Sequence, residues 1–266
     1  MWLIMELPEW IWERCKYREA CDEKEGEIVS SRTYFWIEDR KDKAGYKFWE
    51  TLMQKLCPDV IVESKQNCSE LVKAVKALRD QENKYIIVFD NAFDNLQIYQ
   101  EKKVLKRYAD LKNNVVLMDI ICFEYILLEF DRLIEWIYAP DDEFLSRRAT
   151  AVRARELLVS AIRSGELDYK TIQEIHEYDV GIGNHNIEQL SARLLFNLTR
   201  NTGFEVSKGK IGDCWIKSCC DWSGRKKNDI CGLDYSRLSV IDKMKEIYEG
   251  SSLVNEFAKV GLEVML

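Results

Sequence analysis

Short apolar segments alternate with segments of helical spacing between residues 32 and 120. The apolar segments, rich in aromatic and β-branched residues, are 32–39, 59–64, 85–90 and 114–120. The segments with helical spacing between them are 43–56, 67–80 and about 98–111. Strands of this kind separated by helices favour a parallel or mostly parallel sheet with helices on both faces. We therefore predict an α/β fold whose ligand site lies beyond the carboxyl ends of the strands.

The pattern becomes mainly helical after residue 120. We predict an apolar helix over 122–138, further helices at about 142–164, 168–178 and 186–200, and two closing helices. Between them, residues 203–235 are irregular with at most one short strand. The predicted division is an N-terminal helical segment at 1–31, an α/β domain at 32–138, and a mainly helical C-terminal region with a Cys-rich irregular segment at 139–266.

The composition limits the cellular setting and the partners. The net charge of −7 and the pI near 5.2 argue against coating nucleic acid by bulk attraction, but not against docking in one local basic groove. No run of 18 or more apolar residues occurs, so no membrane span is expected. The apolar opening lacks a basic leader, so we predict a cytoplasmic protein with reduced thiols.

Carboxylates stand at the ends of two predicted strands. Glu38 and Asp39 close the first strand, and Asp90 and Asp94 close and follow the third. In a parallel sheet both pairs lie at the same edge, where their repulsion is relieved by protons or by a cation. Mg²⁺ and Mn²⁺ take oxygen ligands and neutralise charge on a transferred phosphate, so these acids predict a metal-dependent phosphodiester enzyme. Acidic residues at strand ends also form turns and cap helices, and that alternative stays open.

The order of these elements resembles the Toprim domain of topoisomerases, primases and OLD-family nucleases. The stretch "WIEDRKDKAGYKFWETLMQKLCP" is similar to the first Toprim motif, with Glu38 at the family glutamate and Asp42 at the turn aspartate. The stretch "YIIVFDNAFDN" is similar to the second motif, with Asp90 at its first aspartate and Ala92 where the second aspartate is expected. The resemblance covers about residues 32–138.

This resemblance implies a nuclease that uses Mg²⁺ or Mn²⁺ to cleave phosphodiester bonds in DNA or RNA. It implies catalytic roles for Glu38, Asp42 and Asp90, and a metal held by Glu38, Asp90 and Asp94. The stretch "NVVLMDIICFEYILL", in which Glu124 opens a helix, is similar to the Toprim effectors of PARIS-type anti-phage systems. Those effectors operate beside an ATPase partner, so a role in anti-phage defence with such a partner is implied.

Ala92 leaves a second hypothesis open, in which the metal site of a Toprim-like protein has decayed. Such a protein would act as a binding or regulatory subunit of a larger complex. A plain nucleotide-binding protein is disfavoured because no Gly-rich phosphate loop follows any of the strands. The sequence does not decide whether the substrate is DNA or RNA. It also leaves the oligomeric state open, and a homo-oligomer is one of the options.

Cysteines and basic residues mark the C-terminal region. Cysteines that could hold a structural Zn²⁺, although they lack a C-x-x-C pair, are Cys214, Cys219, Cys220 and Cys231. Buried or incidental thiols are the alternative. Basic residues that could bind a phosphate backbone are Arg148, Arg155, Arg225, Lys226 and Lys227. The alternative is that these basic residues lie on a solvated helix face and form ion pairs with acidic residues.

Overall fold

The structure, a computed structural model, describes residues 31–91, 95–138, 142–178, 186–220, 231–234 and 237–265. The compact unit described below is Arg32–Leu266. The predicted N-terminal helical segment lies outside the described residues, apart from Ser31.

The centre of the fold is a four-stranded parallel sheet in the order β2-β1-β3-β4. Its strands are β1 (Thr33–Ile37), β2 (Val60–Ser64), β3 (Lys84–Val88) and β4 (Val115–Met118). Phe35 in β1 lies opposite Val62 in β2 and Ile86 in β3. The predicted α/β fold with a parallel sheet between helices is confirmed. From β1 the chain goes first to β2 on one side and then to β3 on the other, so the order reverses between β1 and β3.

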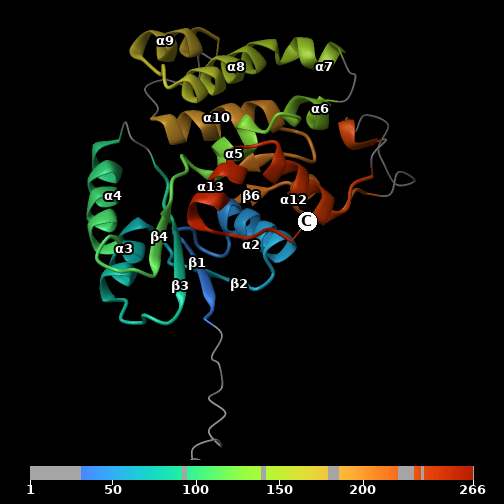
Figure 1. Cartoon of the computed structure of the whole chain (residues 1–266). Coiled ribbons are helices and arrows are strands. Elements are labelled where there is room, and N and C mark those ends of the chain that lie inside the picture. Colours follow the sequence, from blue (N-terminus) through green and yellow to red (C-terminus); the bar gives the residue numbers. More distant parts are fainter. Residues whose placement is uncertain are drawn as a thin grey trace, which may run out of the picture. The chain divides into compact units, whose positions relative to one another are not determined.

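Helices cover both faces of this sheet because successive strand residues point to opposite faces (Figure 1). Trp36 and Ile87 pack against α3 (Cys68–Ala77) and α4 (Leu96–Ala109). Phe35 and Ile86 belong to the larger core on the other face, with α2 (Ala44–Leu56), α12 (Val240–Glu249) and α13 (Leu253–Val260).

The starts of several helices follow from their capping residues: Asn67 accepts a hydrogen bond from the Glu70 amide, and Ser239 forms a capping box with Asp242.

The helices between β4 and α12 complete the larger core. They are α5 (Phe123–Glu129), α6 (Leu133–Tyr138), α7 (Asp142–Arg147), α8 (Ala149–Ser164), α9 (Tyr169–Tyr178), α10 (Ile187–Thr199) and α11 (Asp213–Ile216). Leu194 and Leu195 of α10 lie in the same apolar cluster as β1 and β3. Of the helices in the described ranges, none has both the length and the apolar character that a bilayer span needs.

The single helix predicted over 122–138 is wrong, because the chain breaks into α5 and α6 at Phe130. Phe130 has an extended backbone (φ −50°, ψ 122°), and its buried ring packs edge-on against Trp136 at 4.7 Å. The break leaves helix carbonyls without intrahelical partners. The Arg155 guanidinium donates to two of them, to Leu128 O at 2.6 Å and Phe130 O at 2.9 Å. A segment that is apolar on every side hides such a break from sequence periodicity.

Two further expectations need correction. The predicted helix over 142–164 is divided at Arg148 into α7 and α8. The irregular region at 203–235 contains two short strands rather than at most one, since β5 (Val206–Ser207) and β6 (Lys210–Ile211) pair as an antiparallel ribbon. In the same region, η2 (Gly232–Asp234) is a single 3₁₀ turn.

Candidate functional site

Acidic side chains converge at the carboxyl edge of the sheet. Glu38 and Asp39 follow β1, and Asp90 follows β3, so these residues flank the point where the strand order reverses. In open α/β sheets this point is where ligands bind. Glu124 joins them from the first turn of α5 and Glu188 from the first turn of α10. We call this set the acidic cluster: Glu38, Asp39, Asp90, Glu124 and Glu188.

The pKa values within the acidic cluster are raised by burial and mutual repulsion. Burial raises the pKa of Glu38 to about 7, and the charges of Asp39 and Glu188 act in the same direction. Burial also raises the pKa of Asp90 well above its usual value, and the charges of Glu38 and Glu124 act in the same direction. The carboxyl groups of Glu38 and Asp90 lie close enough to share a hydrogen bond. Such a bond requires a proton between the two oxygens, so the pair holds a proton near neutral pH.

The pKa values of Glu124 and Asp39 are also raised by burial. Burial raises the pKa of Glu124 to about 8, and that of Asp39 is raised by burial despite the opposing charges of Lys43 and Lys208. Within the described part of the chain, no ion pair includes Glu38, Asp90 or Glu124. Protons therefore balance these carboxylates where a cation would otherwise do so.

Two thiols line the acidic cluster. The Cys68 thiol at the start of α3 donates to Glu38 Oε2 at 2.8 Å. Cys122 caps α5, where its sulfur accepts from the Tyr125 amide at 3.4 Å, and it lies close enough to Glu124 to lower the pKa of that carboxyl group. Burial and the neighbouring carboxylates raise the pKa values of both thiols. Both therefore stay protonated, and Cys68 acts as a hydrogen-bond donor to the acids.

Gly45 allows the Asp39 carboxylate to lie against the first turn of α2. A Cβ atom at Gly45 would lie 1.9 Å from Asp39 Oδ2 and 3.0 Å from Phe123 Cδ1. Only a residue without a side chain leaves room for both neighbours. The glycine thus helps to position one member of the acidic cluster.

We expect Gly45→Ala to lower the free energy of unfolding by about 1–2 kcal/mol, because overpacking next to Phe123 and Asp39 outweighs the better helix propensity of alanine. Urea denaturation measures this change. Gly209→Ala is the matched control, since nothing lies within 4 Å of a Cβ there. Equal stability of the two variants would contradict the close packing at Gly45.

The other predicted site residues are distributed as follows. Asp42 is exposed (side chain 66%) and pairs with Arg40 at 3.3 Å and Lys43 at 3.9 Å. Asp94 and Ala92 lie outside the described residues, as do the basic residues of 225–227. Arg148 donates to the carbonyls of Leu198 at 2.8 Å and Arg200 at 2.6 Å, at the end of α10. Arg148 and Arg155 thus both cap helix ends.

The C-terminal cysteines are partly brought together. The thiols of Cys214 and Cys231 form a hydrogen bond, and Cys220 lies close enough to raise the pKa of Cys214. The fully buried Lys243 fixes this region, since its Nζ donates to Cys214 O at 2.9 Å and Lys217 O at 2.8 Å. In the residues that the structure describes, no group of three or more His, Cys, Asp or Glu side chains is arranged to hold a metal ion. Structural Zn²⁺ therefore stays a prediction.

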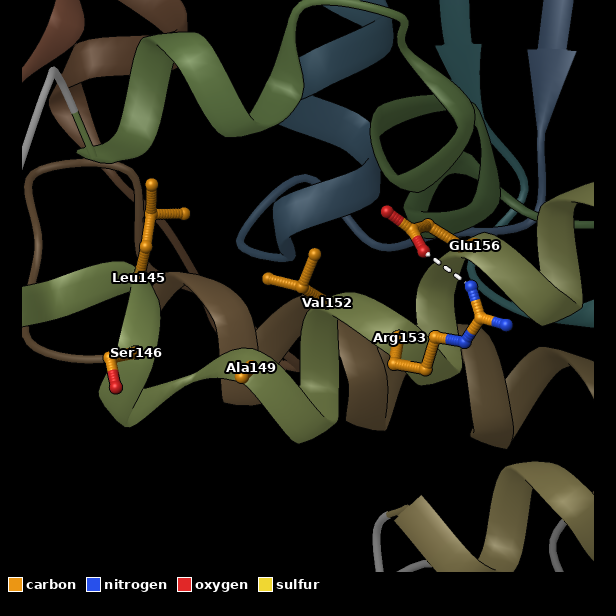
Figure 2. Close-up of a pocket in the computed structure, with 6 residues that line it drawn as sticks. All are labelled: Leu145, Ser146, Ala149, Val152, Arg153 and Glu156. Atoms are coloured by element: carbon orange, nitrogen blue, oxygen red, sulfur yellow. Dashed lines mark hydrogen bonds and ion pairs between the residues drawn. The ribbon is translucent and has the colours of Figure 1, made fainter. Parts of the chain in front are cut away.

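An open hollow along α7 and α8 is separate from the acidic cluster (Figure 2). It is lined by Leu145, Ser146, Ala149, Val152, Arg153 and Glu156. Arg153 and Glu156 form an ion pair at 3.2 Å on the exposed side of α8. No member of the acidic cluster lines this hollow, so it adds nothing to the chemistry at the sheet edge.

Sequence reasoning missed Glu188, Cys68 and Cys122 as neighbours of the site. The start of α10 is visible in the sequence, because Asn186 is a favoured cap and its side chain accepts from the Gln189 amide at 2.9 Å. Its position beside the sheet edge is not visible, since it depends on the packing of α10 against α5. Glu124 was identified only through the resemblance.

The fold and the site together define a class: a parallel α/β protein with an acidic, proton-holding cluster at the reversal point of its sheet. Comparison of the chain with protein-family models, with curated proteins and with solved structures finds no match.

Proposed function

We propose that this chain is a Toprim-like nuclease that uses Mg²⁺ or Mn²⁺ to cleave phosphodiester bonds in DNA or RNA. Its setting is anti-phage defence, beside an ATPase partner that holds the nuclease inactive until it is triggered. The observation that carries the proposal is the placing of Glu38 and Asp90 side by side after β1 and β3, where the strand order reverses, inside a wider set of buried acids.

The donor chemistry of the acidic cluster fits a hard divalent cation. Carboxylate oxygens are the ligands that Mg²⁺ and Mn²⁺ prefer, and buried acids that repel one another gain most from a cation. Glu38, Asp90 and Asp94 would hold the metal. The described residues carry no complete metal-binding group, and Asp94 lies outside them. When bound, the metal would supply charge neutralisation at the scissile phosphate.

The chain's own residues have separate tasks in this proposal. Glu38, with a pKa of about 7, can exchange a proton with water or with a leaving oxygen near neutral pH. The Cys68 thiol orients the Glu38 carboxyl group through its hydrogen bond. Asp42, exposed on the turn before α2, is positioned to contact a substrate that approaches from solvent.

A binding or regulatory subunit is the second candidate function. Ala92 removes a carboxylate that the Toprim motif supplies, and the described residues hold no complete metal-binding group. In this case the acidic cluster keeps its protons and serves the fold alone.

Calorimetric titration with Mn²⁺ and Mg²⁺ separates the two candidates. We expect the wild-type chain to bind the metal and Asp90→Asn to lose binding, because the amide removes the ligand charge but preserves the shape of the side chain. The exposed Glu166→Gln is the matched control. Incubation of the same samples with labelled DNA and RNA then tests cleavage. A folded wild-type chain that binds neither metal would overturn the nuclease proposal in favour of the binding subunit.

A further inference from the structure

We infer that the outer face of α4 is a docking surface for a single strand of nucleic acid, which it leads to the acidic cluster. The choice of nucleic acid as the ligand rests on the proposed function. We call this face the α4 surface and define it by Leu96, Tyr99, Lys103, Lys106 and Arg107.

The α4 surface is locally basic in an acidic chain. Residues 96–112 carry Lys102, Lys103, Lys106, Arg107 and Lys112, against only Glu101 and Asp110 as acids, whereas the whole chain has a net charge of −7. Lys102 is engaged inward, in an ion pair with Asp119 at 2.7 Å. Within the described residues, no ion pair includes Lys103, Lys106 or Arg107. These three side chains are exposed and available to phosphates.

Apolar and aromatic side chains are exposed on the same helix. Four of the eight large apolar residues exposed in the described part of the chain lie there or in the turn after it: Leu96 (70%), Tyr99 (43%), Val104 (45%) and Leu111 (75%). The others are scattered: Ile61, Ile241, Val254 and Met265. The Lys103 ammonium lies 4.8 Å from the centre of the Tyr99 ring. An exposed ring beside cations is the arrangement on which bases of a single strand stack.

The helical spacing places these groups in one row. Leu96, Lys103 and Arg107 follow one another at intervals of seven and four residues, and Tyr99 and Lys106 lie beside them. Leu105 and Ala109 are buried on the opposite side of α4 against the sheet. At a rise of 1.5 Å per residue, the row from Leu96 to Arg107 is about 16 Å long. The described elements that pack closely against α4 are α3 and β4, so its outer face is open (Figure 1).

The row begins at the edge of the sheet where the acidic cluster lies. The helix α4 starts at Leu96, shortly after Asp90 at the end of β3, so its first turn lies at the carboxyl edge of the sheet. Glu101, on the side of α4 turned away from this row, lies close enough to Cys68 to raise the pKa of that thiol, and the Cys68 thiol donates to Glu38, so the inner side of α4 borders the acidic cluster. A strand bound along the α4 surface would reach the acids by passing round the first turn of α4 at this edge of the sheet. The exposed cations favour a polyanion, and the exposed Tyr99 ring favours one with bases that can stack. A single strand of nucleic acid has both properties.

Fluorescence anisotropy with labelled single-stranded DNA and RNA in EDTA tests the inference without metal or cleavage. The triple variant Lys103→Gln, Lys106→Gln, Arg107→Gln is expected to bind at least 10-fold more weakly at low salt. Its salt dependence should be shallower by about 0.7 in log Kd per log salt for each phosphate contact removed. The matched control changes Lys170, Lys217 and Lys245 to Gln, which alters the net charge equally at positions away from α4.

A second pair of variants tests the stacking ring. Tyr99→Ala is expected to weaken binding by about 5-fold or more, whereas Tyr99→Phe keeps the ring and should bind like wild type. Circular dichroism checks that each variant is folded.

The outcomes separate this inference from the proposed function. Binding that depends on the α4 surface supports the inference, whether or not the chain binds metal or cleaves. No binding of either nucleic acid, or binding that the α4 variants leave unchanged, overturns it even if calorimetry finds the metal site intact. Unchanged nucleic-acid binding by the α4 variants, together with an acidic protein that binds wild type but not these variants, would assign the surface to a protein partner instead.

Discussion

Glu38→Gln is expected to lower the rate of nucleic-acid cleavage by about 10²- to 10⁴-fold, which is the usual contribution of a general acid or base. The substitution keeps the size of the side chain and an oxygen that can accept from the Cys68 thiol, now 2.8 Å from Glu38 Oε2. The fold should therefore survive. The measurement is the initial rate on labelled DNA and RNA with Mn²⁺, and the exposed Glu166→Gln is the control.

The pH profile of wild-type cleavage then distinguishes the two roles of Glu38. A base role predicts a rate that rises over the pH range in which the Glu38 carboxyl group loses its proton, because the active form is the carboxylate. The pKa of about 7 applies without metal, and bound Mn²⁺ moves this range to lower pH. An acid role predicts a rate that falls over the same range. A Glu38→Gln protein that cleaves as fast as wild type would remove Glu38 from the reaction altogether.

The second large effect concerns stability without metal. In buffer with EDTA, we expect the free energy of unfolding to fall by a few kcal/mol as the pH rises from about 5 to about 8. The folded-state pKa values of Glu38, about 7, and Glu124, about 8, both exceed the ordinary value of 4.5. Over this range the unfolded chain has lost these protons while the folded chain retains them, so rising pH favours unfolding. Each unit of pKa difference corresponds to about 1.4 kcal/mol.

Urea denaturation at several pH values measures this dependence. Asp90→Asn should raise the stability at pH 8 and flatten the pH dependence, because it removes one of the repelling charges. Under the nuclease proposal, added Mn²⁺ should stabilise wild type more at pH 8 than at pH 6, since the ion competes with protons for the same oxygens. Stability that does not change with pH, in wild type and variant alike, would mean that the acids are better solvated than their burial indicates.

Local pattern was sufficient to predict the layers of the fold. The continuous apolar strands at β1 and β3, the amphipathic spacing of α2 and α3, and caps such as Asn67 are read within a few residues of chain. A parallel sheet follows because helices separate the strands. The same reasoning placed Glu38 and Asp90 at one edge of the sheet, because the carboxyl ends of parallel strands meet there.

Other features are decided by contacts between residues far apart in the chain, which no local pattern records. The break at Phe130 depends on Trp136 and on Arg155, which caps carbonyls 25 and 27 residues away. Glu188 reaches the acidic cluster only because α10 packs against α5. Arg148 and Arg155 read as phosphate ligands in the sequence, yet the structure directs both toward backbone carbonyls.

By itself, then, the sequence determined the secondary structure of the sheet unit and the edge at which its acids gather, since both follow from short-range spacing. Only the tertiary structure decided which acids share protons, which cations are engaged and which face of α4 stays open. Burial and electrostatic interaction are properties of the packed chain, and they arise only when distant elements exclude water from the same place.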